Sequence, residues 1–295
     1  MLPKDHVPPH FSYSSLSSYM QCGQRYFLEK IARVPEVPSW WFVGGRAVHE
    51  VTEIYDVDRK KFEQSGLDQL WTEVFNAEVE AQKARFPDLT QWRTAGKKKA
   101  LPDGEDYLAW MDIGPRFVQN YIDWQAQVGL RLWDDAIVDF DEETGEAKTA
   151  LAVELPIDVS IGGWQMKGSV DRVYVHPNGV DLIVVDLKTG SRMPDNDLQL
   201  GTYSVGMEIQ YGIKPKYGMY FMNRTNKASQ LFELENYTVD SLASMGIQLR
   251  SGIKNKVFLP HKSALCPYCP VNAGCAAFGG KDAALYQIEK VLPSE

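Results

Sequence analysis

The stretch from residue 168 to residue 188 reads GSVDRVYVHPNGVDLIVVDLK, and it decides the fold. Two apolar runs flank the pair Asn178-Gly179, which is typical of a two-residue β-hairpin because both residues tolerate positive φ angles. Residues that face each other across this turn have numbers that sum to 357. Asp171 and Asp186 satisfy that sum, so the pattern predicts two carboxylates side by side on adjacent strands.

A second turn extends this row of acids to a third strand. The pair Gly162-Gly163 predicts a hairpin whose facing residues sum to 325, and this places Glu154 opposite Asp171. Lys188 lies two residues beyond Asp186 and therefore on the same face of its strand. The register predicts three neighbouring carboxylates with an ammonium group beside them.

Carboxylates placed opposite one another on apolar strands need compensation. Like charges facing each other destabilise a sheet, and buried acids must either bind a cation or take up protons. A β-bulge that breaks the register and scatters the acids is the alternative. All-oxygen ligands favour Mg²⁺ or Mn²⁺, and such a metal with a neighbouring lysine is suited to phosphodiester hydrolysis.

The remaining chain predicts an α+β fold with a helical N-terminal part, a central antiparallel meander and a C-terminal cysteine module. A first short helix is expected to be capped by Ser14 and to end near Gln21. Further helices are expected over residues 46–64, 67–86, 105–128, 197–211 and 239–250. Strands are expected over residues 134–140, 148–160, 164–176, 181–188, 216–224 and 230–237. The aromatic run from Trp40 to Phe42 fits either the core or a platform for stacking unpaired bases.

Several motifs resemble the RecB-like branch of the PD-(D/E)xK nuclease superfamily, and they occur in that branch's order. They are Gly45 to His49, Gly168 to Val173, Val184 to Gly190, and then Gln199 and Tyr203. The segment Ser14 to Tyr26, which contains a cysteine, resembles the N-terminal signature of the branch. The resemblance covers residues 12 to 275 and implies a restriction-endonuclease-like core with a central mixed sheet.

This resemblance implies the roles of the site residues. The metal ligands would be His49, Asp171, Asp186 and the backbone carbonyl of Leu187, and Lys188 would be the catalytic lysine. Glu154 corresponds less closely and is expected to support these ligands or to bind a second metal. Gln199 and Tyr203 share a helix face and are expected to border the active site, contacting the DNA backbone or the attacking water. Without the resemblance, a lone helical histidine such as His49 is most often an ordinary core or surface residue.

The cysteines form a pattern of their own. Cys266, Cys269 and Cys275 are spaced C-x2-C-x5-C, and Cys22 is the one other cysteine in the chain. Zinc sites with four cysteines usually draw on two C-x2-4-C pairs, and here there is a single such pair. The pattern resembles the iron–sulfur staple of AddB-type and CRISPR-adaptation exonucleases, which favours a [4Fe–4S] cluster over zinc. Buried cysteines without any ligand are the third possibility.

Length and composition narrow the classes of protein. With 295 residues, 44% hydrophobic and 24% charged, the chain is neither intrinsically disordered nor a disulfide mini-protein. A net charge of −8 argues against nonspecific coating of nucleic acid, although a local basic groove is compatible with it. There is no apolar run of the roughly 18 residues that span a bilayer. The first ten residues carry no secretory signal, so a cytoplasmic protein without a membrane partner is expected.

These features together predict a metal-dependent DNA exonuclease that acts on single-stranded or frayed ends and carries a structural [4Fe–4S] cluster. One nuclease domain is expected over residues 1–295, with a helical insertion over about 50–130, a nuclease core over 131–260, and an iron–sulfur module over 261–280 plus Cys22. The sequence has no P-loop motif, so a separate helicase or recombination partner would open duplex DNA. The alternatives are a catalytically silent DNA-end-binding subunit of a recombination or repair complex, and an iron–sulfur redox protein.

Overall fold

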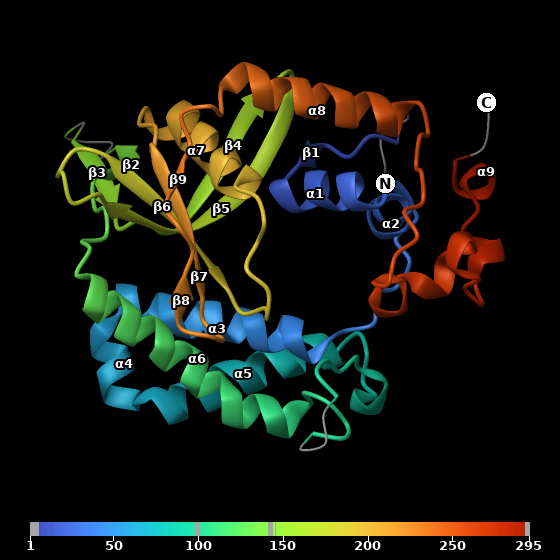
Figure 1. Ribbon diagram of the computed structural model, residues 1–295, viewed down its shortest axis with the longest axis horizontal. Helices are drawn as coiled ribbons and strands as arrows, with labels where there is room; N and C mark the ends of the chain where they lie inside the picture. The colour runs from blue at the N-terminus through green and yellow to red at the C-terminus, as the bar shows by residue number, and fades with distance from the viewer. Residues whose placement is uncertain (1–5, 98–100, 141–143, 145, 293–295) are drawn as a thin grey trace. The chain divides into compact units, whose positions relative to one another are not determined.

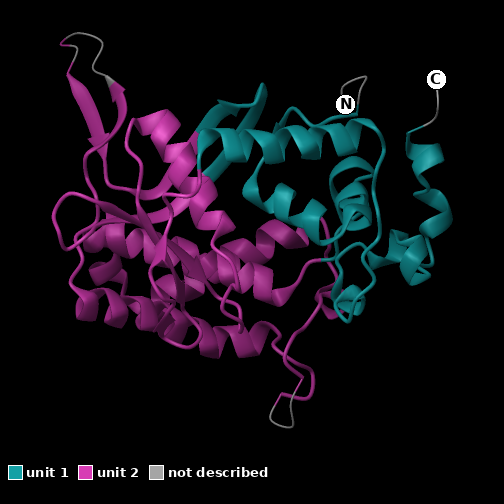
Figure 2. Ribbon diagram, turned by 45° about the horizontal axis from the view of Figure 1, so that its top comes forward, with its two compact units in different colours: residues 1–37, 158–168, 238–295 teal, residues 38–157, 169–237 magenta. Residues whose placement is uncertain are grey.

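The computed structural model describes residues 6–97, 101–140, 144 and 146–292. The chain forms two compact units, coloured separately in Figure 2. Unit 1 comprises residues 1–37, 158–168 and 238–295, and unit 2 comprises residues 38–157 and 169–237. The four cysteines belong to unit 1, whereas the other predicted site residues belong to unit 2.

The first half of unit 2 is a set of packed helices (Figure 1). They are α3 (Trp40–Val57), α4 (Arg59–Ser65), α5 (Leu67–Lys83) and α6 (Tyr107–Val128). Apolar residues on α3, α5 and α6 meet in one buried cluster that includes Val48, Trp71, Phe75 and Trp110. Burial of these large side chains gives the helices their stability, because each buried apolar side chain contributes about 1.5–3 kcal/mol.

Helix α3 begins six residues earlier than the sequence pattern indicates. The expected start after Gly44-Gly45 is wrong, since α3 runs continuously from Trp40. Both glycines lie inside the helix because their neighbours leave no room for a side chain. A Cβ on Gly44 would lie 2.1 Å from the Trp110 ring, and one on Gly45 would lie 2.8 Å from Thr189 Oγ1. The helix ends at Val57, so the expected 46–64 helix is two helices, with Asp58 capping α4.

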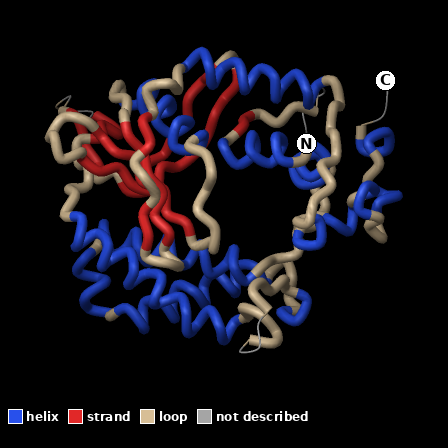
Figure 3. Tube along the Cα trace, viewed as in Figure 1, coloured by secondary structure: helices blue, strands red, loops and turns tan. Residues whose placement is uncertain are grey.

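The central sheet of the fold is mixed (Figure 3). Its strands are β1 (His10–Phe11), β4 (Val153–Ile161), β5 (Trp164–Val175), β6 (Leu182–Lys188), β7 (Tyr217–Met222), β8 (Lys227–Ala228) and β9 (Phe232–Glu233). Strands β5 and β6 are antiparallel, but β6 and β7 are parallel and are joined by α7 (Leu198–Tyr211). The expected mixed sheet is confirmed, and a purely antiparallel meander is wrong because the α7 crossover returns the chain in the same direction.

The predicted hairpin register is correct, but the two-residue turn is wrong. The N–H of His176 donates to the carbonyl of Asp181, so residues 177–180 form a four-residue loop, and of Asn178 and Gly179 only the glycine has a positive φ. Paired residues on β5 and β6 run from Val175 and Leu182 to Arg172 and Val185, and every pair has the sum 357. The ladder ends one pair before Asp171 and Asp186. At the second hairpin, the backbone N–H of Val173 donates to the carbonyl of Ala152, which agrees with the sum of 325.

The two faces of β6 meet different helices. Ile183, Val185 and Leu187 pack into a second buried cluster with Tyr121 and Trp124 of α6. Side chains alternate along a strand, so Asp186 and Lys188 face the other way, toward α7. The whole strand is buried up to its last residue, which explains its nearly continuous apolar sequence.

The structure corrects several other expected element boundaries. The expected strand 148–160 is two strands, because β3 (Ala147–Ala150) pairs with β2 (Ala136–Phe140) in a separate small sheet. The expected strand 230–237 shrinks to Phe232–Glu233.

Unit 1 contains α1 (Tyr13–Gln21), α2 (Gly23–Tyr26), the π-helical turn Phe27–Ile31, α8 (Val239–Lys254) and α9 (Ile288–Val291). Ser12 rather than Ser14 caps α1, because Ser12 and Ser15 form a reciprocal capping box. Short 3₁₀ turns carry the C-terminal cysteine segment, which agrees with its lack of a helical or strand pattern.

Candidate active site

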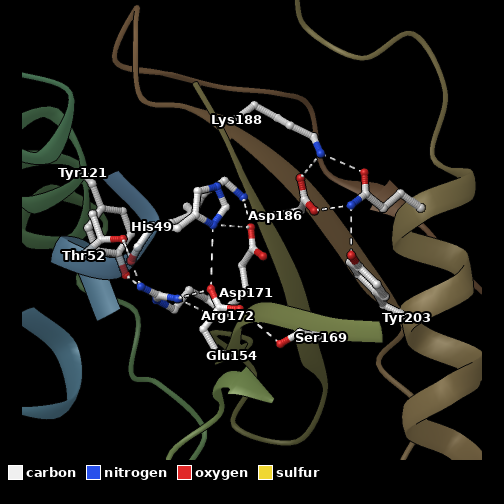
Figure 4. A network of polar contacts seen from close by, with 12 residues as sticks. His49, Thr52, Tyr121, Glu154, Ser169, Asp171, Arg172, Asp186, Lys188 and Tyr203 are labelled. Carbon is white, nitrogen blue, oxygen red and sulfur yellow. Dashed lines mark hydrogen bonds and ion pairs between the residues drawn. The ribbon is translucent and has the colours of Figure 1, made fainter. Parts of the chain in front are cut away.

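Three potential metal ligands from three elements converge in unit 2: His49 of α3, Glu154 of β4 and Asp171 of β5 (Figure 4). One ligand atom from each lies within 4.8 Å of the others. The Nδ1 atom of His49 is 3.6 Å from Asp171 Oδ2 and 3.7 Å from Glu154 Oε1. We refer to these three residues as the ligand group. One imidazole and two carboxylates suit Mn²⁺ or Mg²⁺, and the imidazole makes Mn²⁺ the better match.

The local backbone explains why the two acids reach this point. Because the β5–β6 ladder ends at Arg172, the Asp171 carboxylate takes the place of a backbone acceptor, and the N–H of Leu187 donates to it at 2.7 Å. Glu154 has a φ of +47°, which a non-glycine residue rarely adopts. Its carboxylate accepts a hydrogen bond from Ser169 Oγ at 3.1 Å.

The charges of the ligand group shift one another's pKa values. Burial raises the pKa of Asp171 to about 7, helped by the charges of Asp186 and Glu154 and opposed by His49. Burial acts to lower the pKa of His49, but the surrounding carboxylates outweigh it and raise that pKa overall. Burial acts to raise the pKa of Glu154, but His49 and Arg172 outweigh it and leave that pKa lowered. The group therefore holds a proton near neutral pH, which a cation can replace.

A second observation, at the carboxylate of Glu154, also fits a divalent cation at the ligand group. The Oε1 atom of Glu154 is buried and accepts no hydrogen bond from any residue that the structure describes. A buried carboxylate oxygen without a donor costs free energy unless a cation compensates it. Arg172 Nη1 and His49 Nδ1 lie 3.6 Å and 3.7 Å from this oxygen, beyond hydrogen-bonding distance, so the oxygen is available to a bound cation.

A second set of polar residues lies between β6 and α7, next to the ligand group. The Lys188 ammonium is 2.7 Å from Asp186 Oδ2 and donates to Gln199 Oε1 at 2.8 Å. The amide nitrogen of Gln199 donates to Asp186 Oδ1 at 2.5 Å and to the Tyr203 hydroxyl at 3.0 Å. Asp186 is only 1% exposed, whereas the side chain of Lys188 is 30% exposed. The Lys188 side chain is therefore partly exposed while its ammonium group is held by the buried residues Asp186 and Gln199.

The structure sorts the residues expected at the site into these two sets. His49, Glu154 and Asp171 stand together, so Glu154 has a more central place than the motif comparison gave it. Asp186 pairs with Lys188 instead, and Leu187 contributes a backbone N–H to Asp171. Sequence reasoning missed the buried contacts that the Arg172 side chain makes with Thr52 and Asp56. The one basic residue within the otherwise largely apolar run Val170 to Val175 was the available signal for Arg172, since a buried charge needs a partner.

A hollow of about 960 Å³ lies over the ligand group along α3. His49 and Glu154 line it, together with Trp41, Phe42 and Thr189. Trp40 is buried in the helical core, but the Phe42 side chain is 52% exposed. The aromatic run therefore divides between the two expected roles: Trp40 is a core residue, and Phe42 is accessible to a ligand.

The four cysteines are free thiols, and each is partly buried. The Sγ atom of Cys22 accepts a hydrogen bond from the N–H of His261 at 3.3 Å, so the N-terminal cysteine lies beside the segment that leads to Cys266. Within the described residues, no three of the thiols have sulfur atoms all within 4.8 Å of one another. The arrangement leaves the cysteine ligand set as a prediction.

Comparison with known proteins identifies the family of the chain. The fold and the site combine a mixed sheet, clustered carboxylates and a neighbouring lysine. The family model for the PD-(D/E)XK nuclease superfamily matches residues 10–276. The chain belongs to the PD-(D/E)XK nuclease superfamily, whose members use divalent metals such as Mg²⁺ and Mn²⁺ to cleave DNA.

Two curated proteins are similar over nearly the whole chain. The Gene 69 protein of Mycobacterium phage L5 is 27% identical over 289 residues, which is 92% of this chain and 97% of that protein. The Gene 69 protein of Mycobacterium phage D29 is 26% identical over 279 residues, with the same coverage of 92% and 97%. The crystal structure of SSO0001 aligns with 43% of this chain and 59% of its own, at 22% identity and a TM-score of 0.27. We draw no conclusion from so weak a structural similarity. Among the described residues, no helix has the length and apolar character to cross a bilayer.

Proposed function

We propose that this protein is a RecB-like, Mg²⁺- or Mn²⁺-dependent deoxyribonuclease that removes nucleotides from single-stranded or frayed DNA ends. The observation that carries the proposal is the ligand group of His49, Glu154 and Asp171 beside a solvent-accessible Lys188. Both sets belong to one compact unit. The family match over residues 10–276 supports treating the whole chain as one nuclease domain.

The proposed chemistry assigns separate tasks to the two sets of residues. A divalent cation on the ligand group and Asp186 would lower the pKa of a bound water and polarise a phosphoryl oxygen. Lys188 would hold the attacking water or neutralise charge developing on the phosphate. Gln199 keeps the ammonium in place from one side and Asp186 from the other, while Tyr203 restrains the Gln199 amide. The site is thereby pre-organised for in-line attack on a phosphodiester.

The proposed preference for unpaired DNA rests on the hollow along α3. Phe42 offers an exposed aromatic face there, and Arg46 lies over its ring at 5.9 Å. Aromatic side chains stack on unpaired bases in a sequence-tolerant way, with about 1–3 kcal/mol per base. A duplex keeps its bases stacked on each other, so a separate helicase or recombination partner would supply the open strand.

We further propose that Cys22, Cys266, Cys269 and Cys275 hold a structural [4Fe–4S] cluster. Four free thiols in one unit support it, because thiols of a cluster bind different iron atoms and need not touch one another. Reduced thiols and a DNA substrate also agree with action in the cytoplasm. Purified without oxygen, the protein should contain iron and acid-labile sulfide and absorb near roughly 400 nm. A Cys22→Ser variant should lose all three, and a colourless preparation that contains zinc would contradict the cluster.

The decisive test of the nuclease compares linear and closed substrates. We expect end-labelled single strands to be degraded with Mn²⁺ or Mg²⁺ and to survive in EDTA, while covalently closed single-stranded circles remain intact. Cleavage of circles as fast as linear strands would refute the exonuclease but leave the nuclease. Tight binding of DNA ends without any cleavage would favour the alternative of a catalytically silent end-binding subunit.

Two lysine variants, one in the site and one outside it, form a matched test and control. Lys188→Ala should reduce the cleavage rate by about 10² to 10³, the usual loss when one transition-state donor is removed. Lys216→Ala should leave the rate unchanged, because Lys216 pairs with Asp181 at 3.0 Å and belongs to neither set of site residues. Equal rates for Lys188→Ala and the wild-type protein would overturn the proposed mechanism.

A further inference from the structure

Arg172 is a fully buried cation beside the ligand group. Its side chain is 0% exposed, and it follows directly after Asp171 on β5. The Nε atom of Arg172 donates to Asp56 Oδ2 at 2.6 Å and to the Tyr121 hydroxyl at 3.2 Å. Asp56 is itself 1% exposed and also accepts from Tyr121 and Gln125. Because a buried charge needs a hydrogen-bonded partner, Asp56 holds the guanidinium in one orientation.

The other nitrogens of this guanidinium reach all three members of the ligand group, directly or through one residue (Figure 4). Arg172 Nη1 donates to the backbone carbonyl of Asp171 at 2.6 Å and lies 3.6 Å from Glu154 Oε1. Arg172 Nη2 donates to Thr52 Oγ1 at 3.1 Å. Thr52 Oγ1 in turn donates to the backbone carbonyl of His49 at 2.9 Å.

The geometry points to Arg172 as the positioning residue of the metal centre: one guanidinium, oriented by Asp56, sets the spacing of His49, Glu154 and Asp171. This inference rests on the proposed function, since it assigns a role toward the same cation. Arg172 would not be a ligand, because a guanidinium has donors and no lone pair to offer a metal.

The topology explains why such a residue is needed. His49 lies on a helix, and Glu154 and Asp171 lie on two strands. The two strands are neighbours in one hairpin, but His49 lies more than 100 residues before them in the sequence, so only tertiary contacts bring it to the two acids. His49, Thr52 and Asp56 occupy one face of α3 at spacings of three and four, so two helical turns are tied to the same guanidinium. A guanidinium can serve these contacts at once because it has five donors in a fixed plane, which a lysine lacks.

The test measures Mn²⁺ binding without DNA, by the electron paramagnetic resonance signal of free Mn²⁺. Two variants each remove one buried hydroxyl from the same network. Thr52→Val breaks the link to His49, whereas Tyr174→Phe removes a hydroxyl that contacts Tyr121 and Gln125 rather than the ligand group. Arg172→Lys keeps the positive charge and loses the planar set of donors. Thermal melts in EDTA report the stability of each variant separately.

We expect Arg172→Lys to weaken Mn²⁺ binding about tenfold, the lower end of losses for residues that orient metal ligands. Thr52→Val should weaken Mn²⁺ binding several-fold, and the Mn²⁺ affinity of Tyr174→Phe should stay within about twofold of the wild-type value. In metal-free protein, Thr52→Val should also speed amide hydrogen exchange around His49. Wild-type Mn²⁺ affinity in a folded Thr52→Val variant, or equal losses in Thr52→Val and Tyr174→Phe, would overturn the positioning role. A wild-type protein that binds no Mn²⁺ would overturn the proposed function, and this inference with it.

Discussion

Removal of the Asp171 charge should stabilise the metal-free protein near pH 8. Asp171 is 8% exposed, and its carboxyl group lies among Glu154, Asp186 and His49. Burial, together with the two neighbouring acids, raises its pKa from 3.8 to about 7. An acid whose folded pKa is raised costs stability once it ionises, because the unfolded chain gives up the same proton more easily.

The direction of the pH dependence follows from this shift. Below about pH 4 both states hold the proton and Asp171 has no effect on the free energy of unfolding. Between about pH 4 and pH 7 that free energy falls as pH rises, by at most roughly 4 kcal/mol for a rise in pKa from 3.8 to about 7. His49, whose pKa is also raised, acts in the same direction: its contribution is present at low pH and is lost as pH passes its folded pKa.

Urea unfolding in EDTA, at about pH 5.5 and at about pH 8, tests the predicted fall in the free energy of unfolding. The wild-type protein should be about 2 kcal/mol less stable at the higher pH, half of the ceiling, because about half of the interval between the unfolded and folded pKa values of Asp171 lies above about pH 5.5. Asp171→Asn should lose less than half as much and should exceed the wild-type stability at about pH 8. Added Mn²⁺ should stabilise the wild-type protein at that pH and leave Asp171→Asn unchanged, since binding to the folded state shifts the equilibrium.

Asp181, an aspartate outside both sets of site residues, provides the control. Hydrogen bonds from Asn178 and Lys216 lower the pKa of Asp181, so it is ionised in both states throughout this pH range. Asp181→Asn should therefore keep the wild-type pH dependence. The reasoning fails if Asp171→Asn shows the same loss of stability between the two pH values as the wild-type protein, or is the less stable of the two at the higher pH.

Three further predictions concern separate features. Gly44→Ala should lower the free energy of unfolding by about 3 kcal/mol in a urea titration, because its Cβ would meet the Trp110 ring, while Gly190→Ala, with open space around it, should not. Phe42→Ala should weaken binding of single-stranded DNA by about 1–3 kcal/mol in a fluorescence anisotropy titration with Ca²⁺ in place of Mg²⁺, and Leu108→Ala, 73% exposed, should have no effect. Gln199→Ala should slow cleavage about tenfold or more, with Mn²⁺ affinity within about twofold of wild type, because it releases Lys188 without removing a member of the ligand group.

The sequence by itself determined the parts of this protein that depend on local geometry. Two turn pairs were sufficient to predict which residues face each other, because a turn centred on the pair gives the same register whether two or four residues form the loop, and strand side chains alternate strictly. The long amphipathic helices could be read for the same reason, since their apolar spacing is periodic. These local rules brought Asp171 and Asp186 to one end of one hairpin before any contact was known.

Only the tertiary structure decided which partners the carboxylates of Asp171 and Asp186 contact. The ladder stops one pair before Asp171 and Asp186, so Asp171 turns to Leu187 and His49 while Asp186 pairs with Lys188. No local pattern encodes that divergence, because it depends on α3 and α7 packing against different sides of β6. The same holds for Gly44, which looks like a helix boundary in sequence and is a contact with Trp110 in space. Arg172 is the strongest example, because its partners Thr52 and Asp56 lie more than 100 residues away in the sequence. The hydrogen bonds of its guanidinium form only when the helix and the sheet meet.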